Sequence, residues 1–229
     1  MTIRYIVFDL DDTLWACAPV IKRAEKKHYA WLVEHYPKLT AKYSFDELMQ
    51  NRNAFMTNNP RLVYDLTQLR KSWLKSFADE FGYNDEMVEF AFHTFWLARN
   101  EVNFYDGVLD ILDKLSKQFS LGVISNGNAD INHIGVGHLF DFSVSAREAG
   151  VAKPHPRIFQ LALQKAGIKE DEAVYVGDDP IRDIQGANQA GWHSIWYNPK
   201  SLQWQGEGKP SQIITNFNVL EEKIKLLSV

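Results

Sequence analysis

Short apolar segments that each end in a polar loop are the strongest constraint on how this chain folds. The first runs from Tyr5 to Phe8 and stops at an acidic loop that begins with Asp9. The others are Leu121–Ser125, Ala173–Val176 and Ser194–Tyr197. Such runs, rich in β-branched and aromatic residues and bounded by turn residues, are typical of buried strands.

Helical patterns separate the later apolar segments, over residues 108–117, 157–166 and 184–190. A last helix is expected near residues 218–226, after a polar stretch. Alternating strands and helices predict right-handed βαβ units, and therefore a doubly wound α/β fold whose parallel sheet is covered on both faces. Ligands bind such sheets beyond the carboxyl ends of the strands, where the strand order reverses. We therefore expect the functional site among the polar residues that follow the strands.

Residues 16–104 follow a different pattern, rich in helix formers and aromatic residues, with no convincing strand. We expect an all-helical inserted domain there, with a loop near Asn58 and Pro60, and a core domain made of residues 1–15 and 105–229. Most of the aromatic side chains of the insertion are expected to pack its interior, since aromatics dominate protein cores. They are Tyr29, Trp31, Trp73, Phe77, Phe92, Phe95 and Trp96.

Composition favours a globular protein and names no macromolecular partner. A net charge of -4 over 229 residues gives no basic footprint for nucleic acid or for an anionic membrane. The single cysteine, Cys17, cannot form an internal disulfide, and the first residues lack the pattern of a secretory signal. No segment approaches the roughly 18 apolar residues of a membrane helix. We expect a cytoplasmic protein, monomeric or homodimeric, that acts on a small molecule.

Aspartates follow two of the predicted strands. Asp9 and Asp11 come after the first strand, and Asp178 and Asp183 come after the third. Either pair alone has an ordinary structural explanation, because aspartate often forms turns and caps helices. Carboxylates from both pairs at one sheet edge would repel one another and require a cation. Oxygen ligands of this kind suit Mg²⁺, which the sequence therefore predicts as the cofactor.

Two further segments offer groups that bind phosphate. Ser125 and the backbone amides of Asn126 and Gly127 are neutral donors at the end of a predicted strand, and Lys153 adds positive charge. Taken alone, Lys153 reads as a solvated surface residue. Phosphoryl transfer depends mainly on positioning and on neutralising charge, so a metal, a lysine and backbone amides suffice, with a carboxylate as nucleophile.

Four motifs, in order along nearly the whole chain, resemble those of the haloacid dehalogenase-like hydrolase superfamily. They are Phe8-Asp9-Leu10-Asp11-Asp12-Thr13-Leu14, Ser125-Asn126-Gly127, Lys153-Pro154 and Gly177-Asp178-Asp179-Pro180-Ile181-Arg182-Asp183. One such motif would carry little weight, whereas four in the right order at strand ends are highly specific.

The resemblance implies roles for the reacting residues. Asp9 would be the nucleophile, forming an aspartyl-phosphate, and Asp11 would act as general acid and then as general base. Ser125 would bind the phosphoryl group, with Asn126 and Gly127 beside it, and Lys153 would stabilise both nucleophile and phosphate.

The resemblance also implies a metal site. Asp178, the side chain of Asp9 and the backbone carbonyl of Asp11 would hold Mg²⁺. Asp183 would orient groups around the metal site. Asp179 would contribute through a water molecule or cap the loop.

Within the superfamily, the helical insertion corresponds to a mobile cap that excludes water and selects the substrate. Members that cleave carbon–halogen bonds lack an acid two residues after the nucleophile, because a halide leaves without a proton. An alkoxide needs one, so Asp11 favours a phosphatase over a dehalogenase.

A narrower resemblance involves residues 15–25, especially Pro19, Arg23 and Glu25, together with residues 125–129. These stretches are similar to the bacterial flavin-pathway phosphatases that act on a ribitylamino-uracil phosphate, which suggests riboflavin biosynthesis. Sugar phosphates and nucleotides stay open as substrates. Trp15, Arg23 and Asn128 are candidates for substrate contact, although packing or surface roles explain them more simply.

Other functions remain open at this point. A receiver-like phosphoacceptor uses similar residues around Mg²⁺ on the same kind of sheet, but the helical insertion would have no explanation there. A phosphomutase or a phosphonatase would keep the fold and change the reaction. A phosphonatase needs a cap lysine that forms an imine, and Lys22, Lys26 and Lys27 are placed early enough in the insertion to provide one.

Overall fold

The computed structural model describes residues 2–227, which form two compact units. One unit combines residues up to Ala16 with those from Asn103 onward, and the other is Cys17–Val102. No helix in the described part of the chain is long and apolar enough to cross a membrane.

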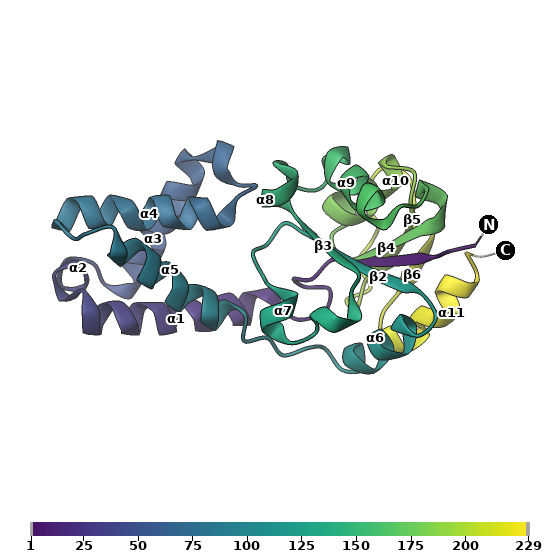
Figure 1. Ribbon diagram of the computed structural model, residues 1–229, viewed down its shortest axis with the longest axis horizontal. Coiled ribbons are helices and arrows are strands. Elements are labelled where there is room, and N and C mark those ends of the chain that lie inside the picture. The colour runs from purple at the N-terminus through teal and green to yellow at the C-terminus, as the bar shows by residue number, and fades with distance from the viewer. Residues whose placement is uncertain (1, 228–229) are drawn as a thin grey trace. The chain divides into compact units, whose positions relative to one another are not determined.

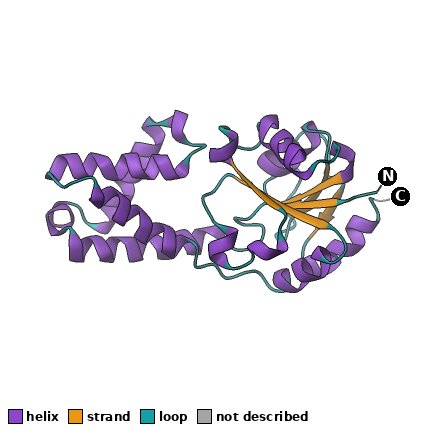
Figure 2. Ribbon diagram, viewed as in Figure 1, coloured by secondary structure: helices purple, strands orange, loops and turns teal. Residues whose placement is uncertain are grey.

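The first unit, the core unit, is built on a parallel sheet, whose strands are orange in Figure 2. Within the described residues the sheet has six strands, in the order β3-β2-β1-β4-β5-β6. The strands are β1 (Tyr5–Phe8), β2 (Ser120–Ser125), β3 (Phe142–Ser145), β4 (Ala173–Gly177), β5 (His193–Tyr197) and β6 (Gln212–Ile214). Every pairing in the sheet is parallel. The predicted doubly wound α/β fold is therefore confirmed, and the four predicted strands are all present.

Helices cover both faces of this sheet. They are α6 (Val108–Ser116), α7 (Ile131–Ile134), α8 (Ala146–Ala149), α9 (Pro156–Ala166), α10 (Gly186–Gln189) and α11 (Leu220–Lys225). In Figure 1, α9 and α10 lie on one side of the strands, while α6 and α11 lie together on the other. Short 3₁₀ turns at Gly137–Leu139, Glu170–Glu172 and Phe217–Val219 complete the unit.

The edge strands β3 and β6 were not anticipated from the sequence. Each is only three or four residues long and buries few side chains, so the apolar signal that marks the central strands is weak. The predicted helix over residues 184–190 is also different in detail. A π-helix over Pro180–Gln185 comes first and α10 follows it.

The order of the strands places the functional edge of the sheet. The chain passes from β1 to β2 and β3 on one side, and β4 then pairs with the other side of β1. Phe8 lies opposite Val176 in this pairing, and the Asp9 amide donates to the Val176 carbonyl at 2.9 Å. The carboxyl ends of β1 and β4 are therefore held side by side where the strand order reverses, which is where ligands bind such sheets.

The second unit, the helical unit, contains α1 (Cys17–His35), α2 (Pro37–Lys42), α3 (Phe45–Asn58), α4 (Leu66–Phe81) and α5 (Glu86–Arg99), with a 3₁₀ turn at Pro60–Leu62. The boundaries of α3 and α4 follow from local chemistry. Ser44 and Glu47 form a reciprocal capping box at the start of α3, Asp65 accepts from the Gln68 amide at the start of α4, and Gly82 ends α4 with a left-handed φ of 67°.

The interior of the helical unit is apolar and aromatic. Trp73, Phe77 and Phe95 are at most 3% exposed, and Tyr29, Trp31 and Phe92 are partly buried against the same core. Trp73 and Phe77 meet edge to face, with ring centroids 5.3 Å apart.

A buried ionic cluster crosses this interior. Glu25 on α1 accepts from Arg52 on α3 and from Arg70 on α4, and His28 Nδ1 lies 3.9 Å from its carboxylate. The Arg70 guanidinium also stacks on Phe95, 3.3 Å from the ring centroid. Burial alone would raise the pKa of Glu25, but His28, Arg70 and Arg52 outweigh burial and hold this pKa below its usual value.

Replacing Glu25 with glutamine is expected to destabilise the helical unit, because it leaves two buried guanidinium groups without their shared counter-charge. Losing one partner of a buried ion pair typically costs about 3–5 kcal/mol. Urea unfolding at neutral pH measures the change. Glu101→Gln is the matched control, since Glu101 forms an exposed pair with Lys27 that should contribute less than about 1 kcal/mol. Equal effects of the two variants would contradict the role assigned to Glu25.

Candidate active site

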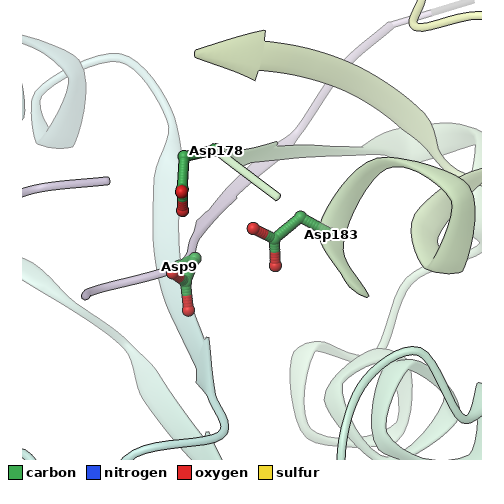
Figure 3. A group of neighbouring side chains, drawn as sticks. All are labelled: Asp9, Asp178 and Asp183. Carbon is green, nitrogen blue, oxygen red and sulfur yellow. The ribbon is translucent and has the colours of Figure 1, made fainter. Parts of the chain in front are cut away.

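The site forms where the loops after β1 and β4 meet. Asp9, Asp178 and Asp183 can each present a carboxylate oxygen within 4.8 Å of the others. Figure 3 shows the three side chains gathered together, Asp9 and Asp178 from neighbouring strand ends and Asp183 from the π-helix. All three belong to the core unit.

Lys153 supplies positive charge beside these carboxylates. Its ammonium group donates to Asp9 Oδ1 at 2.6 Å, to Asp183 Oδ1 at 2.6 Å and to the Tyr175 hydroxyl at 2.8 Å. Lys153 is only 5% exposed. The interpretation that its sequence position alone suggests, a solvated surface lysine, is therefore wrong. Burial alone would lower its pKa, but the carboxylates of Asp183 and Asp9 outweigh burial and raise the pKa above its usual value. The side chain is therefore a fixed cation.

Asn126 holds the Lys153 segment in place. Its side-chain amide donates to the Lys153 carbonyl at 3.1 Å, and its Oδ1 accepts from the Lys153 amide at 2.7 Å. Ser125 is buried at the end of β2, where its hydroxyl accepts from the Gly127 amide at 3.0 Å. The segment predicted to bind phosphate thus stands beside the lysine and is tied to it.

The site raises the pKa values of both Asp178 and Asp9. Burial and the nearby Asp183 raise the pKa of Asp178 to about 7, although a hydrogen bond from Thr13 Oγ1 at 3.1 Å acts in the opposite direction. Thr13 also lies 3.4 Å from Asp9 Oδ2. Burial raises the pKa of Asp9 as well, with Lys153 opposing that shift. A divalent cation among these groups would favour the ionised form of both carboxylates.

Asp183 has both carboxylate oxygens engaged by the protein. Lys153 donates to Oδ1, and the Asp179 amide donates to Oδ2 at 2.9 Å. Gly177 makes this close approach possible, because a Cβ at that position would lie 2.5 Å from the Asp183 carboxylate. Asp179 Oδ1 accepts from the amides of Ile181 and Arg182, so this side chain caps the turn that carries Asp183.

Asp11 is not a member of this group of three carboxylates and lies on the turn that follows β1. Its Oδ1 accepts from the indole Nε1 of Trp15 at 2.9 Å. Trp15 is fully buried in this structure, so its ring packs inside the core unit rather than facing a ligand. Arg23, another candidate for substrate contact, donates to the Glu101 carbonyl within the helical unit.

Sequence reasoning did not identify three polar side chains that shape the site, Thr13, Tyr175 and Trp196. Tyr175 lies in an apolar strand, where its hydroxyl donates to the Ile124 carbonyl at 3.0 Å and accepts from Lys153. The indole of Trp196 donates to the Asp178 carbonyl at 2.8 Å. Of these three, only Thr13 could have been found from the sequence, because it directly follows the aspartates after the first strand.

The donor set fits Mg²⁺. Three carboxylates face a single ammonium group, so the cluster retains excess negative charge, and its oxygens are the hard ligands that Mg²⁺ takes. Asp183 accepts close hydrogen bonds on both oxygens, from Lys153 and from a backbone amide. Oδ2 of Asp9 and Oδ1 of Asp178 instead accept from Thr13 at the longer distances of 3.4 and 3.1 Å. Asp9 and Asp178 are therefore better placed to provide direct ligands.

Comparison with known proteins agrees with this geometry. The family model for the haloacid dehalogenase-like hydrolases matches residues 3–191. The chain is 29% identical to 5-amino-6-(5-phospho-D-ribitylamino)uracil phosphatase YigB of Escherichia coli, over 87% of this chain and 85% of that one. It is 31% identical to glyceraldehyde 3-phosphate phosphatase of Methanopyrus kandleri, over 84% of this chain and 83% of that one.

Solved structures show the same relationship. The structure of a 2-haloacid dehalogenase from Pseudomonas syringae superposes with a TM-score of 0.91 at 36% identity, covering 98% of this chain and 99% of that one. The magnesium-bound hydrolase YfnB of Bacillus subtilis shares the fold, with a TM-score of 0.68 at 18% identity, over 98% of this chain and all of that one. From its motifs, its fold and these matches, the chain belongs to the haloacid dehalogenase-like hydrolase family.

Proposed function

We propose that the protein is a Mg²⁺-dependent phosphatase that hydrolyses a small phosphate monoester through an aspartyl-phosphate on Asp9. The observation that carries the proposal is the contact of buried Asp9 with buried Lys153 inside a cluster of carboxylates. A fixed ammonium group beside the nucleophile can neutralise the phosphoryl oxygens as they approach.

In the first step, an Asp9 carboxylate oxygen attacks phosphorus and the bond from phosphorus to the alcohol oxygen breaks. Asp11 donates its proton to the departing oxygen. In the second step, Asp11 accepts a proton from a water molecule that attacks the aspartyl-phosphate, and the Asp9 carboxylate leaves. Lys153 and the hydroxyl of Ser125 orient the phosphoryl group in both steps. Asp9, Asp178 and the Asp11 carbonyl would hold Mg²⁺, which would supply positive charge to neutralise the phosphoryl oxygens.

Two relatives support a substrate that carries its phosphate on a short polyol or sugar-like chain. Their names specify a phosphorylated ribityl group and glyceraldehyde 3-phosphate. In both, the leaving group is an alkoxide that requires a proton, which matches the role proposed for Asp11. Flavin-pathway intermediates, sugar phosphates and nucleotides are therefore the compounds to screen.

The helical unit is proposed to select this substrate as a cap. It is inserted between Ala16 and Asn103, so it joins the core unit through two chain connections. Its interior is packed, and the ion pairs of Glu25 connect three of its helices, which favours movement of the helical unit as one body.

Dehalogenation is the alternative to phosphate hydrolysis. One observation favours it, because the similar structure from Pseudomonas syringae is named a 2-haloacid dehalogenase. Asp11 argues against it for this chain, because a halide leaves without a proton. Assays of both reactions separate the two functions directly.

The wild-type protein is expected to release phosphate from glyceraldehyde 3-phosphate and p-nitrophenyl phosphate, and no chloride from 2-chloropropionate. The nearly isosteric change Asp9→Asn removes the nucleophile, so phosphate release should fall below detection while the thermal unfolding temperature is retained. Asp113→Asn on the exposed face of α6 is the control and should keep full activity. Turnover by the Asp9→Asn protein, or chloride release by the wild type, would refute the proposal.

Stabilisation by Mg²⁺ should depend on pH in a direction set by Asp178. Its folded-state pKa of about 7 exceeds the reference value of 3.8, so the folded metal-free protein binds more protons than the unfolded chain between these values. Stability of the metal-free protein therefore declines as pH rises toward 7. Mg²⁺ removes this penalty by neutralising the ionised carboxylate.

Differential scanning calorimetry with EDTA or with Mg²⁺ measures the effect. The rise in unfolding temperature on adding Mg²⁺ should be larger at about pH 8 than at about pH 5.5, because at the lower pH the metal must displace a proton from Asp178. Asp178→Asn should remove most of the rise at both pH values. A rise that is equal at both values in the wild type would show that Asp178 does not bind the metal.

A further inference from the structure

We propose that Trp15 is a positioning residue for proton transfer, in that its indole N–H orients the Asp11 carboxyl group. The contact is a hydrogen bond of 2.9 Å from Nε1 to Oδ1 of Asp11. The inference rests on the role proposed above for Asp11 and extends it to a residue that touches no substrate.

The backbone fixes Trp15 relative to Asp11. The two residues pair as an isolated bridge, and the Asp12 amide donates to the Trp15 carbonyl at 2.7 Å. Asp12 adopts a left-handed φ of 64°, which turns the chain back within a few residues. The loop after β1 is thus a closed turn that returns the tryptophan to the side of the acid.

The indole ring is fixed as well. It is fully buried and meets Phe104 edge to face, with centroids 5.4 Å apart and an interplanar angle of 85°. Trp15 also pairs with Phe104 as a backbone bridge, and the next amide, that of Tyr105, donates to the Leu14 carbonyl at 2.9 Å. Because the backbone of Trp15 is hydrogen-bonded and its ring is packed against Phe104, the indole has little freedom to redirect its N–H.

This geometry favours one oxygen of Asp11 over the other as the site of the proton. An indole N–H is a donor only, so it cannot accept a hydrogen bond from a protonated carboxyl oxygen. With Oδ1 accepting from Trp15, the acidic proton of Asp11 belongs on Oδ2. Trp15 therefore orients a carboxyl group whose Oδ2 delivers the proton to the leaving oxygen and later takes one from water.

The test compares two leaving groups in single-turnover experiments, since only one of them needs a proton. p-Nitrophenolate leaves as a stable anion, whereas the alkoxide of glyceraldehyde 3-phosphate must be protonated. Trp15→Phe keeps an aromatic ring but removes the N–H. We expect the phosphoryl-transfer rate to fall roughly tenfold with the alkyl ester, the effect of losing one hydrogen bond to the carboxylate that develops as Asp11 releases its proton. With the aryl ester the rate should change less than about twofold.

Two further variants make the comparison specific. Phe104→Leu loosens the packing of the ring but keeps the N–H, so its loss with the alkyl ester should be smaller than that of Trp15→Phe. Asp11→Asn should reduce alkyl ester cleavage by about 10² to 10⁴-fold and aryl ester cleavage far less. Adding Trp15→Phe to Asp11→Asn should cause no further selective loss, because the acid that Trp15 orients is already absent.

The outcomes separate the two claims. If Asp11→Asn shows no preference between the substrates, the role proposed for Asp11 is wrong. If Asp11→Asn is selective but Trp15→Phe slows both substrates equally, or neither, then Trp15 only packs the core and the inference about it is overturned. Should Trp15→Phe fail to fold, benzothienylalanine at position 15 replaces the N–H with sulfur in a ring of nearly the same shape, and the same substrate preference decides the question.

Discussion

The site depends on one ammonium group that is shared by two buried carboxylates. Lys153 holds Asp9 and Asp183 at the same distance, 2.6 Å, and the hydroxyl of Tyr175 takes its third hydrogen bond. Removing the ammonium group would leave two buried carboxylates without their shared counter-charge. The carboxylates are therefore held close together in spite of their repulsion, and a single lysine does not neutralise all of them.

The parallel sheet brings these groups together from distant parts of the sequence. The register of β1 against β4 sets Asp9 beside the turn that carries Asp178, and the π-helix after that turn brings Asp183 back over Gly177. The end of β2 provides Ser125 and Asn126, and Asn126 fixes the backbone of Lys153. Asp9, Ser125 and Asp178 thus stand at or directly after strand ends, and hydrogen bonds to Asn126 fix the loop that carries Lys153. Such support keeps a site arranged before a ligand arrives.

Much of this arrangement could be predicted from the sequence, because the signals were local. An apolar run that ends in an acidic loop marks a strand end, and strand ends of a parallel sheet meet at one edge. The contacts of Tyr175, Trp15 and Trp196 could not be predicted, since a polar tip on an aromatic ring gives no periodic signal and its partner lies elsewhere in the chain. The same holds for the edge strands β3 and β6, which form by pairing with neighbours more than by their own apolar content. The burial of Lys153 could not be predicted for a similar reason, because nothing in the sequence around a lysine beside a proline indicates that it is buried.

The central claim is that Asp9, and no other aspartate of the cluster, carries the phosphoryl group. Acid quenching during turnover, followed by borohydride reduction, converts an aspartyl-phosphate into homoserine, and peptide mass spectrometry locates the altered residue. The account predicts homoserine at position 9, dependent on both the phosphate ester and Mg²⁺. Homoserine at position 11, 178 or 183, or none at any position while turnover proceeds, would contradict it.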